Sequence, residues 1–324
     1  MRVLITGGAG FVGSHLIEYI KSISPDIEIF AADRWLTRKD NINHLMWQIN
    51  YREFDMTDYG SVLGLIQESK PHRIFHLAAQ SFVPNSWKAP AETLNTNIMG
   101  ELNLFEAIRA AGIEPRIQVA GSSEEYGLVW PEETPIRETN PLRPLSPYGV
   151  SKIAQDFLGY QYWESYGMRI VRTRAFNHTG PRRGEQFATS SFAKQIAEIE
   201  AGLRSAHIMT GNLGAERDFT DVRDIVRGYW MLTEDNVPAG EVYNLCSGTH
   251  RTIREVVETL IRVSGMTKPV ELLSDEARQR PSDVPRLYGD YTKVHEATGW
   301  APVIPFDQTM LDLLNYWRAR IKKE

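Results

Sequence analysis

The chain has little cysteine, no long apolar run and no large excess of charge of either sign. Cys246 is the single cysteine among 324 residues, so an intrachain disulfide is excluded and a cysteine-based metal site is disfavoured. No stretch approaches the roughly 18 consecutive apolar residues of a membrane span. The 36 Lys+Arg and 41 Asp+Glu residues leave a net charge of −5, which argues against nucleic acid or a membrane surface as the main partner.

A signal sequence is not expected either, because the first apolar run, Val3 to Ile5, ends at once in Thr6-Gly7-Gly8. These features favour a cytoplasmic protein. Hydrophobic residues at 42% and charged residues at 24% are ordinary globular values, which excludes disorder over most of the chain. The length suggests about two domains, or one large α/β unit with an appended lobe.

Short apolar runs alternate with helical patterns over the first part of the chain. Candidate strands lie at 2–6, 27–32, 74–79, 117–120 and 169–174, and one of the helical patterns between them covers 97–111. This alternation predicts an α/β fold with a Rossmann-type, doubly wound parallel sheet. Five prolines between Trp130 and Pro147 predict a long loop, followed by a helix over 148–166.

The second half of the chain predicts a smaller, mostly helical lobe, with helices near 253–263, 294–298 and 310–322. We expect the Rossmann domain to cover 1–175, with a return segment near 218–246. The lobe would then be formed by 176–217 and 247–324. In doubly wound folds such a lobe closes over the carboxyl edge of the sheet, where ligands bind.

A glycine-rich turn between the first strand and helix predicts a dinucleotide site. The segment contains Gly7, Gly10, Phe11, Val12 and Gly13. Glycines let the backbone approach a pyrophosphate, which binds the N–H groups at the helix start. The alternative interpretation of this pattern is an ordinary strand-to-helix turn.

Asp33 ends the next strand 20 residues after Gly13, the spacing expected of a carboxylate that binds a ribose. Asp33 favours NAD, because a carboxylate repels a 2′-phosphate, whereas Arg34 could pair with that phosphate of NADP. Asp55 and Met56 end a further short strand, where the carboxylate could meet the adenine. Asp55 is equally compatible with the N-cap of a following helix.

Tyr148 and Lys152 are four residues apart and therefore lie on one face of the predicted helix. A nearby ammonium favours a phenolate, so we expect Lys152 to lower the pKa of Tyr148. Ser122 follows the fourth strand and could hold a substrate oxygen beside Tyr148. Glu124 could act as a second acid or base, whereas the strand alternation points Glu125 outward.

Together these motifs resemble the extended short-chain dehydrogenase/reductase family. The resemblance is carried by the segments GGAGFVG, YGVSK and SSEEYG, and by HLAAQS, FNHTGPRRGE, RDFTDV and RPSDV. Within that family the chain is most similar to GDP-mannose 4,6-dehydratases and GDP-4-keto-6-deoxy-mannose reductases. The match runs the length of the chain.

This resemblance implies roles for individual residues. Ser122, Glu124, Tyr148 and Lys152 fall on catalytic positions. Cofactor contacts are implied at the glycine turn, Asp33, Arg34, Asp55, Met56, Leu77, Ala78, Ala79, Tyr148 and Lys152. Contacts to a GDP-sugar are implied at Ser81, Ser122, Glu124, Asn177, Lys194, Arg217 and Arg280. It also implies NAD or NADP as cofactor, no metal, and a homodimer or homotetramer.

Two activities remain open at this point. A dehydratase would need a base for C5 of the sugar, and Glu124 and the PRRGE segment favour it. A reductase would need no such base. Ser191 stands where dehydratases carry a lysine, which leaves Lys194 as the candidate, and this departure together with RDFTDV favours the reductases. A catalytically silent nucleotide-binding module and an epimerase are further alternatives.

Overall fold

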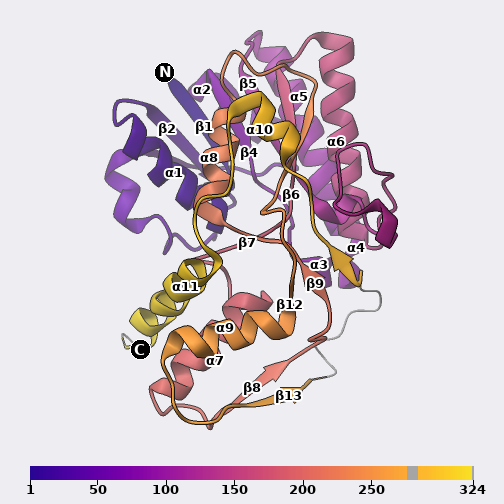
Figure 1. The fold of residues 1–324 in the computed structure, drawn as a ribbon. Helices are drawn as coiled ribbons and strands as arrows, with labels where there is room; N and C mark the ends of the chain where they lie inside the picture. Colours follow the sequence, from indigo (N-terminus) through magenta and orange to yellow (C-terminus); the bar gives the residue numbers. More distant parts are fainter. Residues whose placement is uncertain (276–283, 323–324) are drawn as a thin grey trace.

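The computed structural model describes residues 1–275 and 284–322, and its centre is a parallel sheet of seven strands (Figure 1). In spatial order these strands are β11 (Val242–Leu245), β6 (Ile170–Ala175), β5 (Arg116–Ser122), β4 (Arg73–His76), β1 (Arg2–Thr6), β2 (Glu28–Asp33) and β3 (Asn50–Glu53). The winding direction reverses between β1 and β4. Doubly wound folds bind ligands at the carboxyl ends of the strands at such a reversal.

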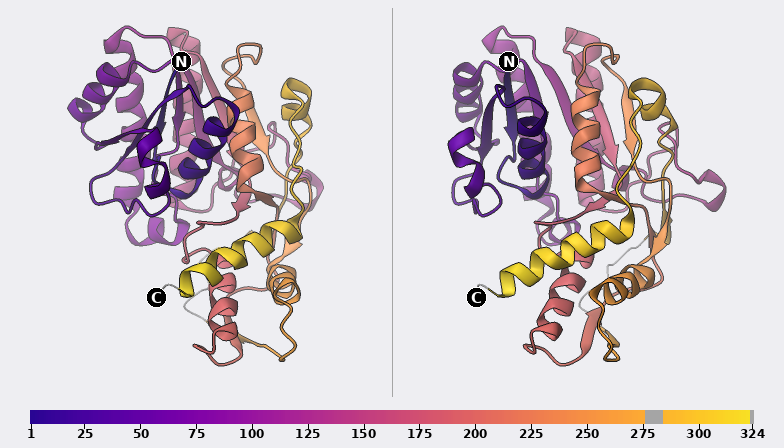
Figure 2. Two further views of the ribbon diagram at one scale, coloured as in Figure 1. Left: turned by 90° about the vertical axis from the view of Figure 1, so that its left-hand side faces the viewer. Right: turned by 60° about the vertical axis from the view of Figure 1, so that its left-hand side comes forward.

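Helices cover both faces of this sheet, as Figure 2 shows from two sides. One face is covered by α1 (Phe11–Ile23), α8 (Val222–Leu232) and α10 (Thr292–Thr298). The other is covered by α2 (Tyr59–Ser69), α5 (Gly100–Ala111) and α6 (Pro147–Tyr166). The short helices α3 (Val83–Lys88) and α4 (Pro90–Leu94) and a π-helical turn (Asn95–Met99) lead into α5.

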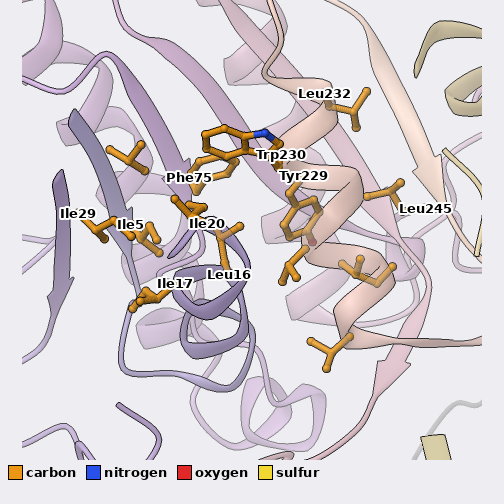
Figure 3. Close-up of a cluster of buried hydrophobic side chains, with 14 of the residues drawn as sticks. Ile5, Leu16, Ile17, Ile20, Ile29, Phe75, Tyr229, Trp230, Leu232 and Leu245 are labelled. Carbon is orange, nitrogen blue, oxygen red and sulfur yellow. The ribbon is translucent and has the colours of Figure 1, made fainter. Parts of the chain in front are cut away.

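The side chains of β1 show why a sheet forms here. Val3 and Ile5 enter the core under α1 and α8, whereas Leu4 enters the core under α2 and α5. Both faces of the strand are therefore buried, which explains its continuous apolar run. Figure 3 shows the first of these cores, in which Leu16 from α1 and Tyr229 from α8 lie between the helices and the sheet.

The lobe is built on a separate core between α7 (Ala188–Glu200), α9 (Ile253–Ser264) and α11 (Phe306–Ile321). Short strands complete it, and they pair over long distances in the sequence: β7 (Asn177–Thr179) with β10 (Phe219–Asp221), β8 (His207–Thr210) with β13 (Glu271–Ser274), and β9 (Glu216–Arg217) with β12 (Arg251–Thr252) and β14 (Arg286–Leu287). Figure 1 places this lobe below the sheet.

The predicted sheet is confirmed, and the differences from expectation are local. β4 ends at His76, so 77–79 follow the strand instead of belonging to it, and β3 ends at Glu53. A 3-10 turn, η3 (Ser123–Glu125), directly follows β5, and the proline-rich loop contains another at Pro131–Glu133. The division at residue 175 stays a prediction. Within 1–275 and 284–322, no helix has the length and apolar character needed to cross a membrane.

Candidate active site

The glycine turn between β1 and α1 is packed too tightly for larger residues. A Cβ on Gly13 would lie 2.4 Å from the carbonyl oxygen of Gly7, and one on Gly8 would lie 2.8 Å from Cβ of Ala31. Gly7 has a φ of +72°, which glycine adopts without strain. α1 then begins at Phe11 with no side-chain cap and no acidic residue in its first turn. The N–H groups of this helix start fit the predicted diphosphate site.

Asp33 lies at the end of β2 beside this turn. Its Oδ2 accepts a hydrogen bond from the Ala9 N–H at 3.2 Å. Its Oδ1 accepts from the Arg34 N–H at 2.8 Å and from the Thr37 hydroxyl at 2.9 Å. The carboxylate is therefore fixed against the glycine turn, as a ribose-binding residue would need to be. The Arg34 residue is exposed.

The segment after β4 lies against the same turn. The N–H groups of Leu77 and Ala78 donate to Oγ1 of Thr6, each at 3.2 Å. A Cβ on Gly7 would lie 3.0 Å from the Ala78 nitrogen. Leu77, Ala78 and Ala79 are all half-buried. They thus flank the point where the sheet reverses direction, and their contact with a cofactor stays a prediction.

Asp55 does not cap α2, so that alternative is wrong. Asp58 is the N-cap, and its Oδ1 accepts from the Ser61 N–H at 3.1 Å. Asp55 instead accepts from the N–H and the hydroxyl of Thr57, at 2.8 and 2.7 Å. This local turn satisfies one oxygen of the carboxylate. Met56 is buried, and the role of both residues at the adenine stays a prediction.

Ser122, Tyr148 and Lys152 converge at the carboxyl end of β5. Ser122 is the last residue of that strand, and its side chain acts on the hydroxyl of Tyr148, where it lowers the pKa of the phenol. Tyr148 lies in the first turn of α6, whose N-cap Ser146 accepts from a backbone N–H one turn on. Lys152 Nζ lies 5.9 Å from the Tyr148 ring centroid and donates to the Ala120 carbonyl at 2.8 Å.

Burial dominates the acid–base properties of these groups. It raises the pKa of Tyr148 above its ordinary value, and the Ser122 side chain offsets only part of that rise. The net pKa of Tyr148 is therefore raised, so the lowered value expected from the spacing of Tyr148 and Lys152 is wrong for the group as a whole. Burial also lowers the pKa of Lys152 to about 8, while Glu101 and Glu125 act in the opposite direction.

The two glutamates after β5 have different surroundings. Glu124 is half-buried, its N–H donates to Oγ of Ser122 at 3.2 Å, and its charge raises the pKa of Tyr148. Glu125 is fully buried, accepts from the Ser122 N–H at 2.7 Å and pairs with Arg174 at 3.0 Å. The outward orientation expected of Glu125 is wrong, because the 3-10 turn η3 ends the strand alternation after Ser122.

The residues expected to bind the sugar nucleotide are spread over separate elements. Ser81 and Asn177 are exposed, after β4 and at the start of β7. Lys194, on α7, pairs with Glu185. Arg217, on β9, is buried and donates to the Val284 carbonyl at 2.7 Å. Arg280 lies outside the described residues. These assignments stay predictions.

Reasoning from the sequence gave no separate role to Arg183, which lies in the segment between β7 and α7. Its guanidinium lies 3.5 Å over the Phe187 ring and 5.0 Å from the ring centroid of Phe11 in the glycine turn. Burial lowers the pKa of Arg183 to about 10, and the nearby Tyr148 acts in the opposite direction. A cation in this position suits an anionic part of a ligand. The PRRGE segment was the signal for it.

His178 packs against the glycine turn. Its Nδ1 lies 2.9 Å from the Phe176 carbonyl, and its ring stacks on Phe11 at 6.1 Å. Burial lowers the pKa of His178 to about 4, so the ring is neutral at ordinary pH. It therefore supports the glycine turn by packing.

A doubly wound sheet, a glycine turn with an acidic residue after β2, and a Ser–Tyr–Lys group beside β5 are the features of an extended short-chain dehydrogenase/reductase. The chain belongs to a particular branch of that class, the GDP-mannose 4,6 dehydratase family, whose model matches residues 4–313.

Relatives within this branch have two different names. A GDP-6-deoxy-D-mannose reductase of Pseudomonas aeruginosa is 33% identical over 323 residues, covering 100% of this chain and 99% of the relative. A GDP-mannose 4,6-dehydratase of Yersinia enterocolitica is 32% identical, covering 97% of this chain and 92% of the relative.

Solved structures agree with the fold. The structure of RMD from Pseudomonas aeruginosa complexed with NADPH is 32% identical with a TM-score of 0.86, covering 98% of this chain and 99% of that one. A UDP-glucose 4-epimerase of Thermus thermophilus in complex with NAD is 30% identical with a TM-score of 0.86, again covering 98% and 99%.

Proposed function

We propose that this protein is a GDP-mannose 4,6-dehydratase that forms GDP-4-keto-6-deoxy-mannose. The observation that carries the proposal is the position of Glu124. Its N–H is bonded to Oγ of Ser122, and its charge acts on the hydroxyl of Tyr148. A carboxylate beside the residue that would deprotonate the C4 hydroxyl is well placed to act on the neighbouring C5 hydrogen.

The residues of the chain would divide the reaction between them. Tyr148, as a phenolate, takes the proton of the C4 hydroxyl. The resulting 4-ketone makes the C5 hydrogen acidic, and Glu124 removes it. Ser122 and Glu124 then help the C6 hydroxyl leave as water. Lys152 supplies a positive charge that favours the phenolate and holds a ribose hydroxyl. A nicotinamide cofactor, when bound, would supply the hydride acceptor for C4 and the hydride donor for C6.

NAD or NADP fits the residues that are present. The uncapped start of α1 and the guanidinium of Arg183 both suit a diphosphate. The carboxylate of Asp33, fixed beside Ala9, supports NAD. The exposed Arg34 residue supports NADP. A relative of known structure binds NADPH and another binds NAD, and we favour NAD slightly on the ground of Asp33.

A GDP-sugar as substrate is supported by the names of the relatives, and assembly by the surface of α6. Val150, Phe157 and Tyr160 are exposed at 46%, 55% and 43% on this helix, and their spacing places them close together on its surface. We propose that this face joins two copies of the chain in a homodimer or in each half of a homotetramer. A cytoplasmic location is supported by the single, buried Cys246.

The proposed activity is tested by incubating the protein with GDP-mannose and a trace of oxidised cofactor. We expect the sugar nucleotide to lose one water and to gain a 4-keto group, with no net consumption of cofactor. A catalytically inactive Tyr148→Phe preparation is the control for contaminating enzymes. Absence of the 4-keto-6-deoxy product with both NAD and NADP would exclude this activity.

The second candidate function is the reduction of GDP-4-keto-6-deoxy-mannose, and the reductase of Pseudomonas aeruginosa favours it. Ser122, Tyr148 and Lys152 would suffice for that reaction, since Tyr148 would donate a proton to the 4-keto oxygen. A reductase would consume reduced cofactor in a one-to-one ratio with the keto sugar and would leave GDP-mannose unchanged.

A further inference from the structure

Glu101 is a buried acid that the proposed mechanism does not use. It is the second residue of α5 and is 0% exposed. Its Oε2 accepts a hydrogen bond from Nε2 of Gln155 at 2.8 Å, whereas its Oε1 is buried without a hydrogen-bond partner. A carboxylate that is removed from water carries a large energetic cost unless a cation or several donors compensate it.

Burial raises the pKa of Glu101 well above its ordinary value, and the cation whose charge opposes that rise is Lys152. Gln155 is three residues after Lys152 on α6, so the residue bonded to Glu101 is the neighbour of Lys152 on the same face of the helix. Lys152 is itself only 4% exposed, and its ammonium donates a hydrogen bond to the neutral carbonyl of Ala120. Both groups are thus buried, and the charge of each favours the charged form of the other.

His76 borders the same cluster and is neutral. The Thr6 hydroxyl accepts from the N–H groups of Leu77 and Ala78, so its own proton points to Nδ1 of His76 at 2.9 Å. The single proton of the imidazole is then on Nε2, which lies 3.9 Å from Oε2 of Glu101. Burial lowers the pKa of His76 to about 3, so this ring supplies no charge.

We propose that Glu101 is the counter-ion of Lys152: a positioning residue that acts through Lys152 by keeping its buried ammonium charged. The remaining charged groups that act on Glu101 are Glu125 from η3 and Asp156 from α6, and both are negative. They cannot neutralise Glu101, and Arg174 already bridges them at 3.0 and 2.7 Å. Lys152 is therefore the partner that remains.

The inference rests on the proposed function only for the use of Lys152 in catalysis, and its test does not need turnover. The test is a titration of Lys152 by NMR in protein carrying lysine labelled with ¹³C at Cε, with Lys152→Arg identifying the resonance. Glu101→Gln keeps the shape and the oxygen that Gln155 needs. We expect the titration midpoint of Lys152 to fall by about one pH unit or more in this variant.

Glu106→Gln is the matched control, because Glu106 lies on the same helix and pairs with Arg109 near the surface. It should leave the midpoint of Lys152 unchanged. An unchanged midpoint in Glu101→Gln would overturn the proposal, even if the protein proves to be an active dehydratase. Conversely, a shifted midpoint in a protein that does not act on GDP-mannose would support Glu101 as the counter-ion of Lys152 and would contradict the proposed function.

A double-mutant cycle keeps the proposal testable should Glu101→Gln fold poorly. Lys152→Met alone leaves the Glu101 carboxylate without a positive partner. Glu101→Gln alone leaves the Lys152 ammonium without a negative partner. The double variant removes both charges, so its melting temperature should exceed that of Lys152→Met. Effects on melting temperature that simply add would contradict the pairing.

Discussion

At the scale of single residues, Tyr148 gives the sharpest test, because the proposed reaction begins at its hydroxyl. Tyr148→Phe keeps the ring in its buried site but removes the hydroxyl on which Ser122 acts. Turnover should fall by about 10²-fold or more, while the dissociation constants of cofactor and GDP-sugar stay close to wild type. Near-normal turnover in a fixed-time activity assay would show that the Tyr148 hydroxyl does not take part in the mechanism.

We expect Lys152 to give the proposed reaction a defined dependence on pH. Burial lowers the pKa of Lys152 from its usual range to about 8, so the ammonium is lost as the pH rises through that value. We expect kcat/KM to decline on the alkaline side with a midpoint near this pKa. A pH profile measured in wild-type enzyme checks this, and a profile that stays flat to well above that pH would show that the charge of Lys152 is not needed.

We expect Asp33 to control the choice of cofactor, and its carboxylate also supports the turn. Asp33→Asn keeps an oxygen for the Ala9 N–H but removes the charge that repels a 2′-phosphate. The ratio of NADP to NAD affinity should therefore rise, by an amount that titration calorimetry with each cofactor gives directly. Arg34→Gln should lower that ratio. A wild-type protein that already prefers NADP strongly would contradict this interpretation of Asp33.

At the scale of secondary-structure elements, the turn from β1 to α1 has no space for a side chain. Gly13→Ala would place a Cβ 2.4 Å from the Gly7 carbonyl, so the turn must open. We expect a loss of about 1–3 kcal/mol in the free energy of unfolding and weak cofactor binding. Gly64→Ala in α2 is the matched control, since nothing lies within 4 Å of its added Cβ.

That control should raise the stability slightly, because alanine favours a helix over glycine by up to about 1 kcal/mol. Thermal melts of both variants, together with cofactor titrations, give the comparison. Equal cofactor affinity in Gly13→Ala and wild type would show that the geometry of the turn does not determine binding.

The elements also show what could be predicted from the sequence. The strand, turn and helix at the amino terminus were predicted because their signals are local: an apolar run, glycines, then a helical pattern. The pairing of β8 with β13 was not, since each strand has four residues and they are about 60 residues apart. The prediction that Glu125 points outward was wrong because η3 ends the strand alternation after Ser122.

The same limit applies to the candidate site. Ser122, Tyr148 and Lys152 were identified from spacing and resemblance, and the structure brings them together. Glu101 was not identified, although a glutamate on the buried stripe of α5, four residues before Phe105, is a visible anomaly. Its proposed partner, Lys152, lies on α6. The packing of α5 on α6 cannot be predicted from the sequence pattern of either helix alone.

At the scale of the whole molecule, the exposed apolar face of α6 predicts assembly. Phe157 is 55% exposed, and replacing it by Asp places a charge in the proposed interface. Light scattering should show a shift toward monomer for Phe157→Asp at equal concentration. Glu164→Gln, an exposed change further along α6, is the control. A wild-type monomer at micromolar concentration would contradict the proposed dimer.

Replacing Glu124 should separate oxidation at C4 from the later elimination of water. Glu124→Gln should still permit oxidation at C4, since that step uses Tyr148, but elimination should stall without the carboxylate. Reduced nicotinamide absorbance should then build up to at most about one equivalent per active site, with little 6-deoxy product. A variant that makes product at the wild-type rate would show that the C5 base is another group.

The most direct measurement of the dehydratase proposal follows hydrogen at C5 of the sugar. Wild-type enzyme is incubated with GDP-mannose and a trace of oxidised cofactor in deuterated water, and the product is examined by NMR. Removal of the C5 hydrogen and its later replacement from solvent predict a 4-keto-6-deoxy sugar with deuterium at C5. An unchanged GDP-mannose, together with consumption of reduced cofactor when GDP-4-keto-6-deoxy-mannose is supplied, would contradict dehydration and establish the reductase.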